Sequence, residues 1–154
     1  MPDNAGMTLE RAPDGPPAPL AGLRVLELSN FMAGPYCGLV LADLGADVIK
    51  VENPNGGDFS RDSPPFVGGI SAGFLALNRN KRSLAVDLKH PEGRALFLRL
   101  ARAADVVLEN FRPGTMRDLG IDYETVRADN PGVVYCSVSG YGRTGPYRAG
   151  PGST

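Results

Sequence analysis

The stretch of this sequence that could do chemistry most directly is a short basic segment, residues 78–82, which reads Asn-Arg-Asn-Lys-Arg. Its three cations, Arg79, Lys81 and Arg82, stand just ahead of an apolar run at residues 84–86. Arginine and lysine donate charge-assisted hydrogen bonds that suit phosphate oxygens, so the segment suggests a phosphorylated ligand. A solvated basic turn is the simpler interpretation of the same composition. The segment alone leaves both interpretations open.

Size and composition narrow the class of protein. A chain of 154 residues with 42% hydrophobic and 21% charged residues fits one globular domain. Its net charge of −1 gives no overall attraction for nucleic acid or a membrane surface, so any attraction for an anion must be local. No run approaches the ~18 apolar residues of a membrane span. Cys37 and Cys136 stand apart within apolar segments, which predicts buried free thiols in a cytoplasmic protein and no metal site.

Strand and helix signals alternate along the chain after a proline-rich start. Residues 1–18 predict a disordered leader, and the glycine-rich residues 139–154 predict a loop that ends without a closing element. Helices are expected from Pro35 to Gly45 and over residues 91–104, 113–120 and 122–128. The expected strands cover residues 23–28, 47–51, 83–88, 105–108 and 133–138. This alternation predicts an α/β fold with a mostly parallel sheet and flanking helices.

In such a sheet, ligands bind beyond the carboxyl ends of the strands. The segments expected there are residues 29–32, 52–53, 109–112 and 139–142, which are polar and rich in glycine. Residues 53–73 form too long a connection for a simple turn and are interpreted as a functional or mobile loop.

The first predicted turn from strand to helix does not carry a nucleotide-binding motif. The turn after the first strand reads SNFMAGP and lacks the G-x-G-x-x-G of dinucleotide-binding folds, although Glu52 stands where a ribose-binding acid would be. No P-loop occurs in the chain, and His90 precedes a proline at a predicted helix start. His90 is therefore interpreted as a helix cap.

Six sequence blocks carry a more specific signal. They are PLAGLRVLEL at 19–28, AGPYCGLVLADLGADVIKVE at 33–52, GGDFSR at 56–61, LNRNKRSLAVDLKHPEGR at 77–94, ADVVLENFRPGTMRDLG at 104–120 and NPGVVYCSVSGYGRTGPY at 130–147. In their order and spacing, these blocks make residues 19–152 resemble the class III CoA-transferase (CaiB/BaiF) family. The resemblance implies a Rossmann-like CoA-binding domain over residues 19–138.

The resemblance also implies a site for coenzyme A or an acyl-CoA, with a carboxylic acid as the second substrate and no metal. Cations such as Arg79, Lys81 and Arg117 would meet the phosphates of CoA, while Phe31, Met32 or Phe111 would flank its adenine or pantetheine. Core packing is the alternative for Phe31 and Met32, and Arg82 is interpreted as structural. The positions that match CoA-contacting residues are Phe31, Met32, Asn78, Arg79, Asn80, Lys81, Asn110, Phe111, Arg112 and Arg117.

Family members transfer CoA between carboxylic acids through an aspartate that attacks the acyl-CoA. The resemblance puts that aspartate after the Gly-Tyr-Gly of residues 140–142 and beyond residue 154, so the chain alone is expected to be inactive. In relatives, each subunit has a second domain and two subunits interlock as a homodimer. The sequence resembles only the first part of that fold, so it is expected to be a truncated part of it. A separate chain carrying the second half is a further expectation.

Two other functions stay open at this point. The chain could be a non-catalytic CoA-binding remnant or a partner subunit. It could also be part of an α-methylacyl-CoA racemase, whose His-Asp pair would fall at residues 152–154. Gly-Ser-Thr stands there instead, which favours the transferase.

Overall fold

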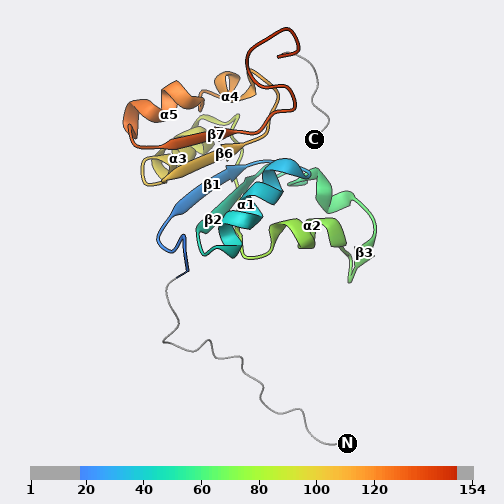
Figure 1. Ribbon diagram of the computed structural model, residues 1–154. Coiled ribbons are helices and arrows are strands. Elements are labelled where there is room, and N and C mark those ends of the chain that lie inside the picture. The colour runs from blue at the N-terminus through green and yellow to red at the C-terminus, as the bar shows by residue number, and fades with distance from the viewer. Residues whose placement is uncertain (1–17, 149–154) are drawn as a thin grey trace, which may run out of the picture.

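The computed structural model describes residues 18–148, which form one parallel sheet flanked by helices (Figure 1). The expected leader and the last residues of the glycine-rich tail lie outside the described residues. The sheet has the strand order β5-β2-β1-β6-β7, and every neighbouring pair is parallel. The α/β prediction is confirmed. The strands are β1 (Arg24–Leu28), β2 (Asp47–Glu52), β5 (Arg82–Ala85), β6 (Val106–Glu109) and β7 (Val134–Ser137).

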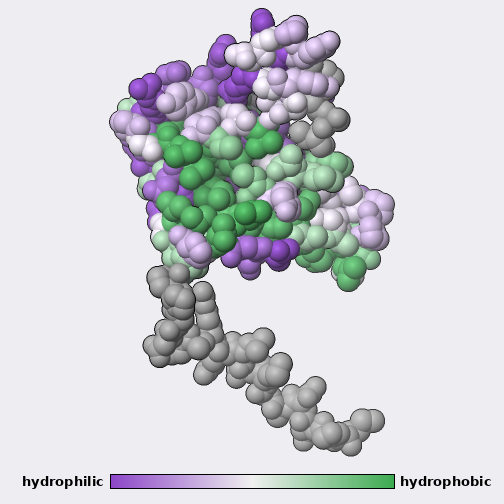
Figure 2. All heavy atoms as spheres, viewed as in Figure 1, coloured by the Kyte–Doolittle hydropathy of each residue, from purple (hydrophilic) through white to green (hydrophobic). Residues whose placement is uncertain are grey.

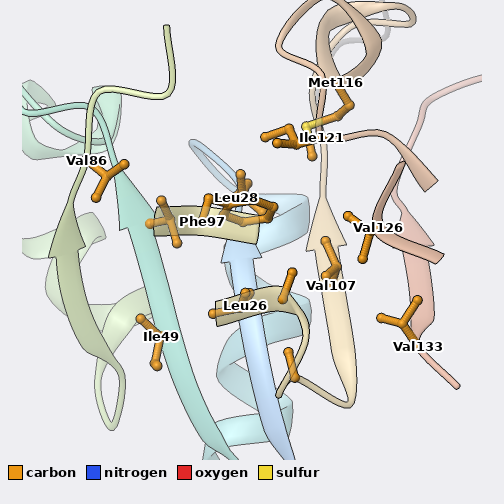
Figure 3. Close-up of a cluster of buried hydrophobic side chains, with 13 residues drawn as sticks. Leu26, Leu28, Ile49, Val86, Phe97, Val107, Met116, Ile121, Val126 and Val133 are labelled. Carbon is orange, nitrogen blue, oxygen red and sulfur yellow. The ribbon is translucent and has the colours of Figure 1, made fainter. Parts of the chain in front are cut away.

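Side chains alternate between the two faces of the central strands. On one face, Leu26 and Leu28 pack with Phe97 in the larger hydrophobic core, as Figure 3 shows. On the other face, Val25 packs with Val48 in a second core that includes Ala42. A strand covered on both sides buries every residue, and all four residues of β1 after Arg24 are buried. One of these four is a glutamate.

Helices α3 (Pro91–Ala101), α4 (Thr115–Asp118) and α5 (Tyr123–Asp129) contribute to the larger core. The apolar stripe of α3 faces the sheet as its periodicity predicts, and Phe97 and Ala101 are buried. His90 caps this helix, since its Nδ1 accepts a hydrogen bond from the backbone N–H of Glu92 at 3.3 Å. The prediction for His90 is therefore confirmed.

Helix α1 (Ala33–Asp43) covers the second core. It starts two residues earlier than expected, so Pro35 lies in its first turn, where a missing backbone N–H costs nothing. Two glycines allow the helix to approach the sheet closely. A Cβ on Gly38 would lie 1.9 Å from Oε2 of Glu27, and one on Gly34 would lie 2.4 Å from Cβ of Ser29.

The segment of residues 53–73, interpreted as a functional or mobile loop, contains short regular elements. The segment contains a 3-10 turn, η1 (Phe59–Asp62), and a hairpin of β3 (Phe66–Val67) and β4 (Ile70–Ser71). Its last residues begin helix α2 (Ala72–Asn78), which Ser71 caps by accepting a hydrogen bond from the N–H of Phe74. These elements are too short to show a clear hydrophobic period in the sequence.

An apolar stripe lies exposed along α1. Met32, Tyr36, Val40 and Leu44 follow one another at four-residue spacing, and each is at least 40% exposed. Figure 2 shows hydrophobic residues gathered over α1 and α2, on the face that the viewer sees. No helix within residues 18–148 is long and apolar enough to cross a membrane.

Gly38→Ala should destabilise the fold by about 1–3 kcal/mol or more, because the added methyl meets a buried carboxylate that cannot move away. Gly73→Ala is the matched control in α2, where a Cβ would touch only Oγ of Ser71 at 3.7 Å. There alanine should be neutral or stabilise the helix by up to about 1 kcal/mol. Urea unfolding followed by circular dichroism measures both, and equal midpoints for the two variants would refute the close approach of α1.

Candidate functional site

A cavity of about 310 Å³ opens at the carboxyl ends of β1, β6 and β7. Three of the four predicted strand-end segments reach it, through residues 30–31, 110–112 and 139–142. Its walls include four of the expected CoA-contacting residues, Phe31, Asn110, Phe111 and Arg112. Among the described residues that line the cavity, none is acidic. Its walls combine aromatic, amide and basic side chains with small and aliphatic residues such as Val138 and Ser139.

The turn between β1 and α1, residues 29–32, forms one wall and is called the corner segment below. The Asn110 side chain holds Asn30 twice, since its Oδ1 accepts from the Asn30 N–H and its Nδ2 donates to the Asn30 carbonyl, both at 2.9 Å. Phe31 has a left-handed φ of 71°, and its N–H donates to Oδ1 of Asp58 at 3.0 Å. Met32 is exposed and does not line the cavity.

Beneath the corner segment lies a buried cluster of four charged side chains, Glu27, Lys50, Asp58 and Lys81, which we call the ionic cluster. Each side chain is at most 2% exposed. The Lys50 ammonium lies 3.0 Å from Oε1 of Glu27 and 2.8 Å from Oδ2 of Asp58, and Lys81 lies 2.8 Å from Oε2 of Glu27. The last two contacts are ion pairs whose angles depart from those of a hydrogen bond. The two positive and two negative charges balance.

Sequence reasoning missed this cluster, although a signal for it exists. Glu27 and Lys50 are single charges within apolar strand runs, and they are Cα partners in the register of β1 and β2. A charge inside a strand that is covered on both faces needs a buried partner. Asp58, in the GGDFSR block, caps η1 by accepting from the N–H of Ser60 at 2.9 Å.

Within the basic segment, the Lys81 side chain points into the protein, while Arg79 and Asn80 bind a nearby carboxylate. Lys81 donates to the carbonyl of Pro35 at 2.8 Å and to Oδ1 of Asn78 at 3.0 Å, and it forms an ion pair with Glu27, so all three of these contacts lie inside the protein. Arg79 pairs with Asp43 at 2.5 Å, and Asn80 donates to the same carboxylate at 2.8 Å. Residues 78–81 do not line the cavity, and their contact with CoA stays a prediction.

Arg82 makes two hydrogen bonds to Asp47, at 2.9 and 2.8 Å, as its structural interpretation predicts. Of the basic segment, Arg79 and Arg82 keep more than half of their side-chain surface exposed. The segment precedes a parallel strand instead of following one. This explains its distance from the cavity, which forms where strands end.

A group of arginines lies beside the cavity. Arg117 is 83% exposed and lines a hollow of about 290 Å³ together with Arg143 and Arg148, while Arg112 joins Arg117 and Arg143 in an adjacent one. Arg143 also pairs with the buried Glu109. The sequence prediction missed Arg143 and Arg148. The sequence signal for these two arginines was their position in the glycine-rich segment directly after the last strand, because ligands bind beyond the carboxyl ends of parallel strands.

A third charged contact ties the loop after β2 to that strand. Arg61 makes two hydrogen bonds to Glu52, at 2.9 and 2.7 Å, and Ser83 donates to the same carboxylate at 2.7 Å.

Burial alone would raise the pKa of Glu52, but these hydrogen bonds outweigh it and hold that pKa below its usual value. Burial likewise opposes ionisation of Asp58, and the adjacent Lys50 ammonium together with hydrogen bonds from Phe31 and Ser60 still keeps its pKa low. Both carboxylates are therefore ionised at neutral pH.

Comparisons with known proteins identify the family of this chain. The sequence model of CoA-transferase family III matches residues 20–153, so the chain belongs to this family. A succinate–glutarate CoA-transferase from Agrobacterium fabrum is 54% identical over 84% of this chain and 34% of its own length. A succinyl-CoA–D-citramalate CoA-transferase from Chloroflexus aurantiacus is 52% identical over 90% of this chain and 35% of its own.

The crystal structure of a CaiB/BaiF family protein from Brucella suis superposes with a TM-score of 0.84 at 48% identity. The match covers 89% of this chain and 37% of that one. The chain thus spans about a third of the length of the relatives that it matches. Within residues 18–148 no cluster of three or more potential metal ligands is found.

Acid should weaken the fold through Glu52 and Asp58. A carboxyl whose folded pKa lies below its unfolded value of about 4 adds stability above that pH and loses it as the pH falls through the folded pKa. The free energy of unfolding should therefore be level above about pH 5 and fall below it. Glu52→Gln should cost about 1–3 kcal/mol at pH 7 and make the acid fall shallower. Urea unfolding at pH 7 and at lower pH measures both effects.

Glu124→Gln is the control, since Glu124 is an exposed carboxylate on α5. It should leave both the stability at neutral pH and the acid response unchanged. An acid profile of Glu52→Gln as steep as that of the wild type would contradict the assignment.

Proposed function

We propose that this chain supplies the CoA-binding part of an enzyme that moves CoA between carboxylic acids. One observation carries the proposal: in a chain of CoA-transferase family III, an aromatic and amide cavity opens beside a group of arginines at the carboxyl edge of the sheet. CoA has apolar and planar parts joined to phosphates, and the two neighbouring surfaces match these two chemistries.

The arginine group supports a particular placement of the phosphates. Arg117 and Arg148 line the same hollow, and within residues 18–148 the only ion pair of Arg117 is a long contact of 3.9 Å with Asp122. The ammonium of Lys81, by contrast, contacts three groups inside the protein. We therefore propose that phosphates bind at Arg117, Arg148 and Arg112, with Phe31 or Phe111 against the adenine or the pantetheine. Arg79 remains a further candidate, because more than half of its side chain is exposed.

Short dicarboxylic acids are the proposed substrates, with succinyl-CoA as a donor. The names of the relatives that are 54% and 52% identical carry succinate, glutarate and citramalate. A cytoplasmic location is proposed with them, since both cysteines of the chain are free thiols.

The proposed reaction proceeds through an aspartyl intermediate. An aspartate attacks the thioester carbonyl, the CoA thiolate leaves, and a mixed anhydride forms. The thiolate then attacks the aspartyl carbonyl, which releases the donor acid and leaves CoA on the enzyme. The acceptor carboxylate reverses these steps to take the CoA. The described cavity lining has no carboxylate, so we propose that the nucleophile belongs to the part of the enzyme that this chain does not span.

A subunit role is the second candidate. An alpha and a beta subunit of a succinyl-CoA–L-malate CoA-transferase from Chloroflexus aurantiacus are 46% and 44% identical to this chain. Family enzymes thus exist whose names record two kinds of subunit. The corresponding proposal is that this chain binds CoA in a complex in which a second copy or another chain supplies the aspartate.

The chain alone should bind CoA without transferring it. Calorimetric titration with CoA should show saturable binding to one site, while succinyl-CoA and labelled glutarate should give no exchange above background. Turnover by the purified chain would contradict the proposed origin of the nucleophile. A complete lack of CoA binding would contradict the proposed function itself.

Arg117→Ala should weaken CoA binding roughly 5- to 50-fold, because a charge-assisted hydrogen bond to phosphate is worth about 1–3 kcal/mol and this one is exposed. If Arg117 contacts the 3′-phosphate, the substitution should weaken the binding of dephospho-CoA less than that of CoA. Arg102→Ala is the matched control, an exposed arginine that pairs with Asp129 and lines none of the arginine hollows. Equal losses in the two variants would leave Arg117 as ordinary surface charge.

A further inference from the structure

Three polar side chains, the buried Lys50 and Asp58 and the half-buried Asn110, hold four backbone groups on three consecutive residues of the corner segment. Lys50 donates to the carbonyl of Ser29 at 2.8 Å, and Asn110 binds both backbone groups of Asn30 at 2.9 Å. Asp58 accepts from the N–H of Phe31 at 3.0 Å. These holders come from β2, from the end of β6 and from the loop after β2. We propose that Lys50 and Asp58 are positioning residues that fix the cavity wall formed by Asn30 and Phe31.

The backbone of the corner segment needs such holders. Phe31 has a φ of 71°, a left-handed conformation that is unfavourable for an L-residue. Methionine at the N-cap, Met32, cannot cap α1 with its side chain, and the first turn of the helix carries no acid. Local interactions therefore do little to select this conformation. The hydrogen bond from the N–H of Phe31 to the carboxylate of Asp58, which lies outside the segment, stabilises this conformation instead.

The ionic cluster in turn fixes Asp58. Its Oδ2 lies 2.8 Å from Lys50, its Oδ1 accepts from the N–H and Oγ of Ser60, and its own N–H donates to Glu52 at 3.1 Å. Its side chain is fully buried, so no rotamer leads to solvent. A well-packed apolar replacement for buried ions is often as stable or more so. The cluster is therefore better explained by the geometry that it imposes than by the stability that it adds.

This positioning has a consequence for binding, which rests on the proposed function. A ligand that enters a preformed cavity does not have to order the wall that it meets, so its affinity is higher. Loss of the hydrogen bond from Phe31 should free the wall and lower the affinity for CoA. The global fold should survive, because β1 itself is held by two neighbouring strands.

The test compares two double variants with the same charge balance, Lys50→Met/Asp58→Asn and Lys50→Met/Asp58→Leu. Both remove one buried cation and one buried anion, but only asparagine can still accept from the N–H of Phe31. Amide hydrogen exchange by NMR should be about tenfold faster at Phe31 in the leucine variant, the effect of one lost hydrogen bond. Exchange at Leu26 and Leu28 should be equal in the two variants. The dissociation constant for CoA should be about threefold to tenfold higher in the leucine variant.

A single substitution repeats the test with both buried lysines in place, in case the double variants do not fold. Asp58→Asn should speed exchange at Phe31 a few-fold, because a neutral amide accepts less strongly than a carboxylate. Asp105→Asn is the matched control, since Asp105 accepts from the N–H of Arg24 at 2.8 Å at the opposite end of β1. It should leave exchange at Phe31 unchanged.

The outcomes separate this inference from the proposed function. Equal exchange at Phe31 in the asparagine and leucine variants, or an equal increase throughout β1, would overturn the positioning role. Equal affinity of the two variants for CoA would overturn it as well. If the wild type binds no CoA, the proposed function fails, while the exchange rates at Phe31 still decide whether Asp58 fixes the corner segment.

Discussion

The pairing of Glu27 with Lys50 is the interaction that constrains the loops at the carboxyl edge of the sheet. A carboxylate and an ammonium face each other across two central strands, and α1 covers them so closely that only glycine fits at position 38. The carboxylate binds a second cation, Lys81, and Lys50 binds a second anion, Asp58. Because unpaired buried charge is costly, the two distant loops that carry these residues must fold back onto the sheet.

Similar pairs of a buried glutamate and a cation occur along the edge of the sheet where the strands have their carboxyl ends. The adjacent strands β1, β2 and β6 each carry one buried glutamate near the carboxyl end, namely Glu27, Glu52 and Glu109. Each glutamate meets a cation that a different loop supplies, namely Lys81, Arg61 and Arg143. Loops are the mobile parts of an α/β domain, and a buried ion pair restricts where each can lie. The strand ends thus form a row of anchoring points for the loops that shape the cavity.

The sequence predicted the fold better than the site. Apolar strands that alternate with helices, together with the helix signals at Pro91 and Asp122, led directly to the parallel sheet. Helix α2 was missed because seven residues hold too little periodicity, and its capping serine stands among turn-forming residues. The strand-end rule brought Phe31, Asn110, Phe111 and Arg112 to one cavity. The function of the basic segment could not be derived in this way, because its partners are remote in sequence.

Lys81 shows why a local count of charge is a poor guide to a phosphate site. Its three partners lie on β1, α1 and α2, and none could be assigned before the chain was folded. A cation contributes to an anion site only after the buried carboxylates have taken their counterions. Glu27 takes Lys81 and Glu52 takes Arg61, which leaves Arg112, Arg117 and Arg148 as the positive charge beside the cavity. The buried glutamates therefore affect the carboxyl edge of the sheet in two ways. They restrict the positions of its loops, and they determine which cations remain available there.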